Sequence, residues 1–285
     1  MAATPSPTVR RKRLGIELRR LREQAGLTCE EVGQRLDCSG TRISRIETGR
    51  IGAKPGDVRE LLETYGITGP EADSLVQLAR EARRKGWWHT YGQVLPPWFE
   101  AYVGLEAAAT RFRDFQPMVM PGLLQTEDYA RTVLRAAPNP GGTEAVDRQV
   151  ALRIQRQSIL DQANPPDLWV VLSESIIRVQ VGGPGVMRAQ LRRLIDVAER
   201  SSVTLQVLPF TAVAHVHPIS PFTILDFPDA ADPTVVYLEH LTGSLFLENE
   251  EEVRRYTVVF DHLRAEALGT GQSIDLIARV AADLS

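Results

Sequence analysis

The chain contains little cysteine, few aromatic residues and no long apolar run. Its two cysteines, Cys29 and Cys38, are too few for a disulfide-rich secreted fold, so a reducing cytoplasm is the expected compartment. No stretch approaches the roughly 18 apolar residues of a membrane span, and no apolar segment follows the basic residues at 10–13, so neither an anchor nor a signal peptide is expected. With 43% hydrophobic and 24% charged residues, the composition is typical of a globular protein rather than a disordered one.

The chain has 33 Lys and Arg against 36 Asp and Glu, a net charge of −3, and the positive excess is gathered at one end. Residues 1–86 contain 17 Lys and Arg against 12 Asp and Glu, a net charge of +5, whereas the remaining residues contain 16 against 24, a net charge of −8. A basic head on an acidic body favours a polyanionic partner for the head alone. A chance excess of arginine on a solvated surface is the alternative.

The chain is long enough for two domains of about 100–200 residues each. Residues 1–7, with two prolines, are expected to be a disordered lead. Residues 8–84 carry apolar side chains at helical spacing with short breaks, which predicts an all-α domain. The first helix is expected to begin near Thr8. Thr28 and Ser39 are expected to cap a second and a third helix, and two more helices are expected at 55–65 and 71–84.

Residues 85–97 break this pattern with tryptophan, tyrosine and proline, and we interpret them as an aromatic linker. Such side chains either pack a neighbouring domain in place or line a binding pocket, and packing is favoured because large apolar side chains are usually buried. Residues 98–285 predict a larger α/β (mixed α+β) domain. Its helices are expected at 99–115, 126–137, 143–163, 185–200, 250–268 and 273–284, and about five strands at 168–172, 203–208, 222–227, 235–238 and 244–247.

The most informative segment is 27–49. Two short helices with capping residues are joined by little more than Asp37 and Cys38, too short a connection for an antiparallel hairpin, so the helices must cross steeply. This arrangement is the helix-turn-helix, whose second helix enters the major groove of DNA. Ile43 and Ile46 would face the core of the bundle, since they recur at helical spacing.

The outward positions of the second helix suit a DNA groove. Arginine can donate two hydrogen bonds to guanine, threonine can contact a thymine methyl, and hydroxyls can bond to bases or phosphates. Each basic residue at a phosphate would steepen the salt dependence of binding. A solvated helix face is the less favoured interpretation. The candidate DNA-binding residues on this helix are Thr41, Arg42, Ser44 and Arg45, with Arg13, Arg50 and Lys54 for phosphates; Arg10, Arg11 and Lys12 extend the basic cluster.

Residues 8–66 resemble the five-helix, lambda-repressor-like DNA-binding domain of Xre-type regulators, most clearly in the stretch Ile-Ser-Arg-Ile-Glu-Thr-Gly at 43–49. The resemblance implies base-reading positions at Gly40, Thr41 and Arg45 and base or phosphate contacts at Arg42 and Thr48. It adds Thr28 and Cys29, at the start of the preceding helix, to the candidate DNA-binding residues. It also implies a structural ion pair between Arg22 and Glu47. Two residues depart from the family pattern: Cys29 stands where a phosphate-contacting glutamine is common, and Gly40 has no side chain to read a base.

The rest of the chain resembles the C-terminal region of a group of actinobacterial, antitoxin-like helix-turn-helix regulators. The similarity is carried by Pro-Gly-Leu-Leu-Gln-Thr-Glu-Asp-Tyr-Ala-Arg at 121–131, the helix at 148–157, and the segments 206–210 and 236–239. That region has no known function, and such regulators are encoded beside a small acidic partner protein. The resemblance implies a regulatory module and leaves its ligand open.

An enzyme is the main competing class, and no catalytic constellation supports it. His215 and His217 could offer two metal nitrogens, but no further ligand motif accompanies them. The segment 182–185, Gly-Gly-Pro-Gly, lacks the spacing of a phosphate loop and is expected to be a strand-to-helix turn. Ser173 and Ser175 lack a nucleophile-elbow context. No metal, cofactor or catalytic residue is therefore expected.

We expect a sequence-specific transcriptional regulator that binds double-stranded DNA as a homodimer. The C-terminal domain would sense a small molecule, bind a partner or dimerise. The alternative is an antitoxin-like protein that binds a small acidic partner and regulates its own operon.

Overall fold

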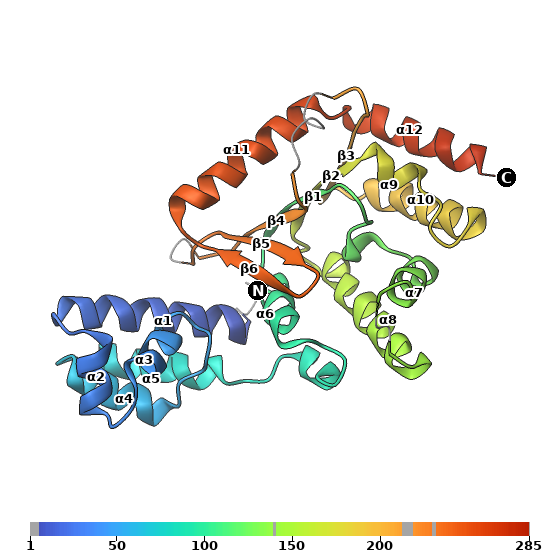
Figure 1. Ribbon diagram of the computed structural model, residues 1–285. Coiled ribbons are helices and arrows are strands. Elements are labelled where there is room, and N and C mark those ends of the chain that lie inside the picture. Colours follow the sequence, from blue (N-terminus) through green and yellow to red (C-terminus); the bar gives the residue numbers. More distant parts are fainter. Residues whose placement is uncertain (1–5, 139–140, 213–218, 230–231, 285) are drawn as a thin grey trace. The chain divides into compact units, whose positions relative to one another are not determined.

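The protein is described here from a computed structural model that defines residues 6–138, 141–212, 219–229 and 232–284 (Figure 1). Its backbone contacts divide it into two compact units. Unit 1 contains Met1–Thr90 and Gly104–Ala108, and unit 2 contains Tyr91–Val103 and Ala109–Ser285. No helix in the described part is long and apolar enough to cross a membrane.

Unit 1 is helical, as expected from the sequence. Its hydrophobic core draws on every helix of the bundle, with Leu18, Val32, Ile46, Leu62 and Ala79 among the buried side chains. The helices are α1 (Pro7–Gln24), α2 (Cys29–Arg35), α3 (Gly40–Glu47), α4 (Pro55–Thr64) and α5 (Pro70–Ala82).

The start of α1 corrects the expected lead. Residues 1–5 lie outside the described residues, but Ser6 is the N-cap of α1 and Pro7 is its first residue. The Ser6 hydroxyl accepts a hydrogen bond from the Val9 amide and donates one to the Gly104 carbonyl, and its side chain is buried. Proline suits the first helical turn because its missing N–H is not needed there.

The aromatic segment 85–97 is partly ordered as a 3₁₀ helix, η1 (Trp87–Tyr91). Trp88 is buried in unit 1, where its ring lies so close to Gly86 and Gly104 that a Cβ at either would meet it within 3.1 Å. Packing, the interpretation favoured for this segment, therefore describes Trp88. Helix α6 (Pro97–Glu106) follows.

Unit 2 is built on a six-stranded mixed sheet with the strand order β3-β2-β1-β4-β5-β6. The pairs β1–β2 and β2–β3 are parallel, and the pairs from β1 to β6 on the other side are antiparallel. The strands are β1 (Arg111–Gln116), β2 (Asp167–Ser173), β3 (Val203–Leu208), β4 (Phe222–Asp226), β5 (Val235–His240) and β6 (Gly243–Leu247). The mixed fold class is confirmed, and the sheet has one strand more than expected.

Strand β1 is the one that the sequence did not predict. The single helix expected over 99–115 is wrong, because α6 ends at Glu106 and the chain is extended again from Arg111. Its burial alternates in part, with Phe112, Asp114 and Phe115 buried, so the pattern fits both a helix end and a strand. Long-range pairing with β2 and β4 places β1 in the middle of the sheet.

Helix α11 (Glu250–Glu266) packs on one face of the sheet through Phe260 and Leu263, against Phe115, Val171 and Phe222 (Figure 1). Helix α12 (Thr270–Asp283) packs on α10 (Pro184–Ala198) and β3. Helices α7 (Glu127–Arg135) and α8 (Thr143–Gln157) pack on each other, and short helices are η2 (Gly122–Leu124), η3 (Ser158–Asp161) and α9 (Glu174–Arg178). The expected helices in this region thus correspond to α7, α8, α10, α11 and α12, whereas α9 was missed.

Candidate nucleic-acid interface

Helix α3 has one face in the core of unit 1 and one in solvent. Ser39 caps its first turn by accepting a hydrogen bond from the Arg42 amide at 3.2 Å. Ile43, Ile46 and Glu47 are buried, and the residues between them are exposed. The inward orientation expected of Ile43 and Ile46 is confirmed.

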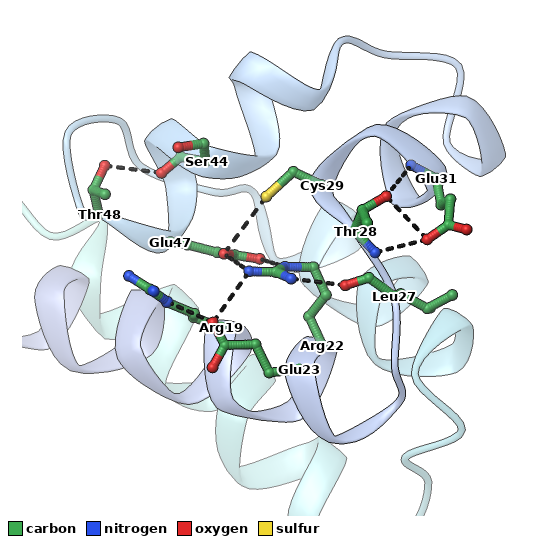
Figure 2. Close-up of polar contacts among 10 residues, drawn as sticks. All are labelled: Arg19, Arg22, Glu23, Leu27, Thr28, Cys29, Glu31, Ser44, Glu47 and Thr48. Atoms are coloured by element: carbon green, nitrogen blue, oxygen red, sulfur yellow. Dashed lines mark hydrogen bonds and ion pairs between the residues drawn. The ribbon is translucent and has the colours of Figure 1, made fainter.

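The candidates that are exposed on or near α3 differ in what else they contact. Thr41, Ser44 and Arg45 are exposed. The Thr48 hydroxyl donates a hydrogen bond to the Ser44 carbonyl at 2.8 Å, so it closes the helix end (Figure 2). Arg42 is exposed but forms an ion pair with Asp57 of α4, with Nη2 and Oδ2 2.5 Å apart. Arg50 and Lys54 are also exposed, and Lys54 is the N-cap of α4.

Other candidates take part in helix capping or close packing. Thr28 forms a capping box with Glu31: its hydroxyl accepts from the Glu31 amide at 3.2 Å, while its own amide donates to the Glu31 carboxylate at 2.7 Å (Figure 2). Gly40 lies against Glu30, whose Oε1 would be 2.8 Å from an added Cβ. Arg13 is half-buried on α1.

Cys29 is half-buried beside Glu47. Its thiol donates to the Glu47 carboxylate across 3.9 Å (Figure 2). Burial raises the pKa of the Cys29 thiol, and the negative charge of Glu47 adds to the effect. The thiol is thus kept protonated and points toward the interior ion pair.

The ion pair between Arg22 and Glu47 fixes α3 to α1, as the family resemblance implied. Arg22 donates from Nε to Oε1 at 2.7 Å and from Nη2 to Oε2 at 2.9 Å, and its Nη1 donates to the Leu27 carbonyl at 2.7 Å (Figure 2). Both side chains are buried. The hydrogen bond to Glu47 holds the pKa of Arg22 above its ordinary value, so the pair stays ionised.

Two glycines permit close backbone approaches around α3. A Cβ on Gly15 of α1 would lie 2.3 Å from the carbonyl oxygen of Glu47. A Cβ on Gly33 of α2 would lie 2.6 Å from the Cys38 carbonyl oxygen and 2.8 Å from the Gly40 amide nitrogen. The turn between α2 and α3 also contains Asp37 in the left-handed region, with φ 49°. These close approaches pack α1 and α2 tightly against α3 and its preceding turn.

The basic cluster at the start of α1 is less free than the sequence suggested. Arg10 forms an ion pair with Glu81 of α5, at 3.3 Å, and is only 13% exposed in its side chain. Arg11, Lys12 and Arg13 are half-buried. The pairings of Arg10 with Glu81 and of Arg42 with Asp57 were missed, because acidic partners 71 and 15 residues away leave no local sequence pattern.

The remaining sequence candidates lie in unit 2. Ser175 donates to the Pro117 carbonyl at 2.9 Å and bonds with Ser173, so both hydroxyls support the backbone. In the segment 182–185, Gly182 and Gly183 lie between α9 and α10 with positive φ, and Pro184 and Gly185 begin α10, so the turn follows a helix and not a strand. His215 and His217 lie outside the described residues. Within the described part, no three potential metal ligands gather.

Two family comparisons match different parts of the chain. Residues 13–75, which contain the whole of α2 and α3, match a helix-turn-helix domain. Residues 99–279 match a domain of unknown function, DUF5753. The chain belongs to the DUF5753 family. No curated protein and no solved structure matches it.

This DUF5753 protein therefore carries a helix-turn-helix domain at its N-terminal end, and that domain class indicates a DNA-binding regulator. The matched range includes Arg22, Glu47 and the exposed face of α3. The DUF5753 match begins within α6 and includes the whole sheet.

Proposed function

We propose that this DUF5753 protein is a sequence-specific transcriptional regulator in which α3 reads the major groove. One observation carries the proposal: Thr41, Ser44 and Arg45 are exposed on a helix whose opposite face is fixed by buried apolar side chains and an ion pair. A rigid helix with free polar side chains supports base recognition, because reading elements must be held in place.

The residues divide into three roles. Arg45 is proposed to donate to a guanine edge, and Thr41 and Ser44 to contact neighbouring bases. Arg42 would leave Asp57 for a phosphate or a base, an exchange that costs little because Arg42 is exposed and Asp57 is only half-buried. Gly40, Thr28 and Cys29 lie at the N-terminal ends of helices, where backbone N–H groups approach phosphates. Thr48 lies at the C-terminal end of α3 and would contact a phosphate by turning its hydroxyl away from the Ser44 carbonyl. Arg13, Arg50 and Lys54 complete the proposed phosphate contacts.

A single helix-turn-helix contacts few base pairs, so we propose a homodimer on a pseudo-palindromic site. Linking two reading heads raises affinity through effective concentration. The two half-sites would then lie about one helical turn, roughly 10 base pairs, apart. The resemblance to Xre-type regulators supports this geometry.

The DUF5753 region is proposed to act as the sensing part of the regulator and to have no enzymatic activity. An antitoxin-like role with a small acidic partner is less favoured, because residues 87–285 themselves have a net charge of −8, 16 basic against 24 acidic, and like charges repel. Copurification with the product of a neighbouring small reading frame distinguishes the two: a stable complex favours the antitoxin-like role.

The test is selection of bound sequences from random DNA at a fixed salt concentration, followed by titration of the selected site. Arg45→Ala is expected to cost about 1–3 kcal/mol and to relax the preference at one base pair. Arg13→Ala is expected to weaken all sequences alike and to reduce the salt slope by about one.

Arg80→Ala, an exposed arginine on α5, is the matched control and should leave affinity unchanged. Unchanged affinity and unchanged base preference in Arg45→Ala would show that α3 does not read the major groove. If no DNA sequence is selected at all, the proposed function is wrong.

A further inference from the structure

Unit 2 contains a cavity of about 640 Å³, and none of the candidate DNA-binding residues lines it. Its floor is the sheet face opposite α11: Phe112, Asp114 and Gln116 alternate along β1 and all line it, whereas Phe115 between them packs on the α11 side. Helices α6 and α8 and the segment at 118–123 supply its walls. The volume lies within the range of small-molecule sites, about 300–1,000 Å³.

One wall of the cavity is aromatic. The rings of Phe99 and Tyr102 of α6 stack with centroids 5.5 Å apart, and Tyr102 stacks on Tyr237 of β5 at 4.1 Å. Trp98 lines the same wall and packs edge-on against Phe99. Because these rings already stack on one another, they offer a ligand an apolar aromatic surface rather than open ring faces, and this surface favours a ligand with a flat apolar body.

The wall formed by α8 carries a guanidinium, that of Arg153, which no bonded carboxylate in the described part of the chain compensates. Arg153 of α8 lines the cavity and donates to the Gln125 amide oxygen at 2.9 Å, and no carboxylate of the described residues lies within ion-pair distance of it. Burial and the nearby positive charge of Arg156 together lower the pKa of Arg153 to about 10, although the carboxylate of Glu239 partly opposes the shift. At neutral pH the guanidinium remains charged, so an anion beside it would offset the cost of burial.

Arg156 adds a second positive charge near Arg153 and also contacts the aromatic wall. Its guanidinium lies over the ring of Phe99, 4.9 Å from the centroid, and 5.5 Å from that of Tyr102. Its position, one turn of α8 away from Arg153, links that guanidinium to the stacking surface.

The position of Arg153 is built by the turn that precedes α7. The side chain of Gln125 is oriented by its own donation to the Met120 carbonyl at 2.6 Å, which leaves its oxygen for Arg153. Gln157 donates to the Gln125 carbonyl at 2.7 Å, and Gln190 donates to the Leu124 carbonyl at 2.8 Å. All three glutamine side chains are buried. The segment 121–131, singled out in the sequence, therefore fixes the Arg153 guanidinium in the cavity wall.

The acidic groups that line the cavity are already engaged. Asp114 accepts from Gln116 at 2.9 Å and from Thr223 at 3.0 Å. Glu239 accepts from the Tyr237 hydroxyl at 3.0 Å and is exposed. The charge that lacks a bonded counterpart is thus the positive one on Arg153.

We infer that this cavity binds a small organic anion with a planar apolar body, its anionic group on Arg153 and its rings along Trp98, Phe99, Tyr102 and Tyr237. That this anion is the regulator's signal rests on the proposed function; that the cavity binds it does not.

The test uses two fluorescent probes that share one aromatic body. Anilinonaphthalene sulfonate carries an anionic group, and phenylnaphthylamine is the same molecule without it. Both are titrated into the full-length protein in the absence of DNA. The sulfonate is expected to bind one site per chain about tenfold or more tightly than the neutral probe. A purely apolar cavity would give the reverse order, because the neutral probe is the more hydrophobic.

Three variants and one control locate the site. Arg153→Gln is expected to weaken the sulfonate about tenfold and to leave the neutral probe within threefold, and Arg153→Lys to retain most of the preference. Arg192→Gln, an exposed arginine on α10 outside the cavity, is the matched control and should change neither. Trp98→Phe should reduce probe emission sensitised by tryptophan. Should Arg153→Gln fail to fold, the inference is still tested by the relative affinities of the two probes for the unaltered protein and by the titration of Arg153→Lys.

Equal or reversed affinities for the two probes, unchanged sulfonate binding in Arg153→Gln, or no binding of either probe would overturn the inference. The selection of DNA sites is measured separately. Probe binding without a selected DNA site would support the anion site and contradict the proposed regulatory function. A selected DNA site without probe binding would support the regulatory function and contradict the anion site.

Discussion

At the residue scale, the side chains of α3 divide by burial into those that hold the helix and those that are free to contact DNA. Glu47 lies in the middle of the segment that suggests DNA reading, yet both of its carboxylate oxygens accept from Arg22. The sequence resemblance assigned it this structural role correctly. Arg42, by contrast, has a partner in Asp57 that no local pattern reveals.

Removing Glu47, the acidic partner of Arg22, should strongly destabilise the folded protein. Glu47→Ala leaves the Arg22 guanidinium buried without a counter-charge, and we expect a loss of about 3–5 kcal/mol in the free energy of unfolding. Urea denaturation of the full chain measures it. The double variant Arg22→Met with Glu47→Leu should recover much of the loss, and Glu23→Ala, an exposed acid on the same ion-pair network, should change little. A loss below about 1 kcal/mol in Glu47→Ala would show that the pair contributes little.

The capping box should give a pH-dependent contribution. Hydrogen bonds from the Thr28 amide and hydroxyl hold the pKa of Glu31 below its ordinary value. A lowered folded-state pKa means stability that is present above the unfolded pKa and lost as pH falls through the folded one. The difference in thermal midpoint between the unaltered protein and Glu31→Ala should therefore be constant at neutral pH and shrink below about pH 4. A difference that does not change with pH would contradict the assignment.

At the scale of elements, the crossing of α2 and α3 depends on a missing side chain. Gly33→Ala would place a Cβ 2.6 Å from the Cys38 carbonyl oxygen, and backbone atoms there cannot yield cheaply. We expect a loss of about 1–3 kcal/mol in stability, as for other overpacking changes. Denaturation by urea provides the measurement.

Gly56→Ala is the matched control for that change, because Gly56 also lies in a helix and nothing stands within 4 Å of an added Cβ. It should be neutral or stabilising by about 0.5–1 kcal/mol, the usual gain for glycine to alanine in a helix. Equal effects at the two positions would mean that the close approach at Gly33 is unimportant.

Elements with a local signal were predictable, and those set by distant pairing were not. The capped helices of unit 1 carry apolar residues at fixed spacing, and α2 begins where Thr28 and Glu31 predict it. Strand β1 was predicted as helix, because its position is set by pairing with Asp167–Ser173 and Phe222–Asp226. The cavity was missed for the same reason: Arg153, Gln125 and the α6 aromatics meet only in the folded chain.

At the scale of the whole molecule, the two units have separate cores and should respond to damage separately. Leu62 is fully buried in unit 1 and Leu172 in unit 2. Leu62→Ala and Leu172→Ala should each cost about 2–5 kcal/mol within their own unit. Hydrogen exchange read peptide by peptide should show faster exchange in 14–79 for the first variant and in 111–208 for the second. Faster exchange throughout the chain in either variant would indicate one cooperative unit instead.

The ion pair behind α3 has an evolutionary consequence. Because Arg22 and Glu47 anchor the helix from its concealed side and Thr41, Ser44 and Arg45 are exposed, we expect stability to change little when these three are replaced by other helix-forming residues. Relatives could exchange these three residues freely, drift to new operators and keep the same thermal tolerance. A library randomised at these positions should therefore yield mostly folded proteins with altered DNA targets, making this a scaffold suited to re-targeting.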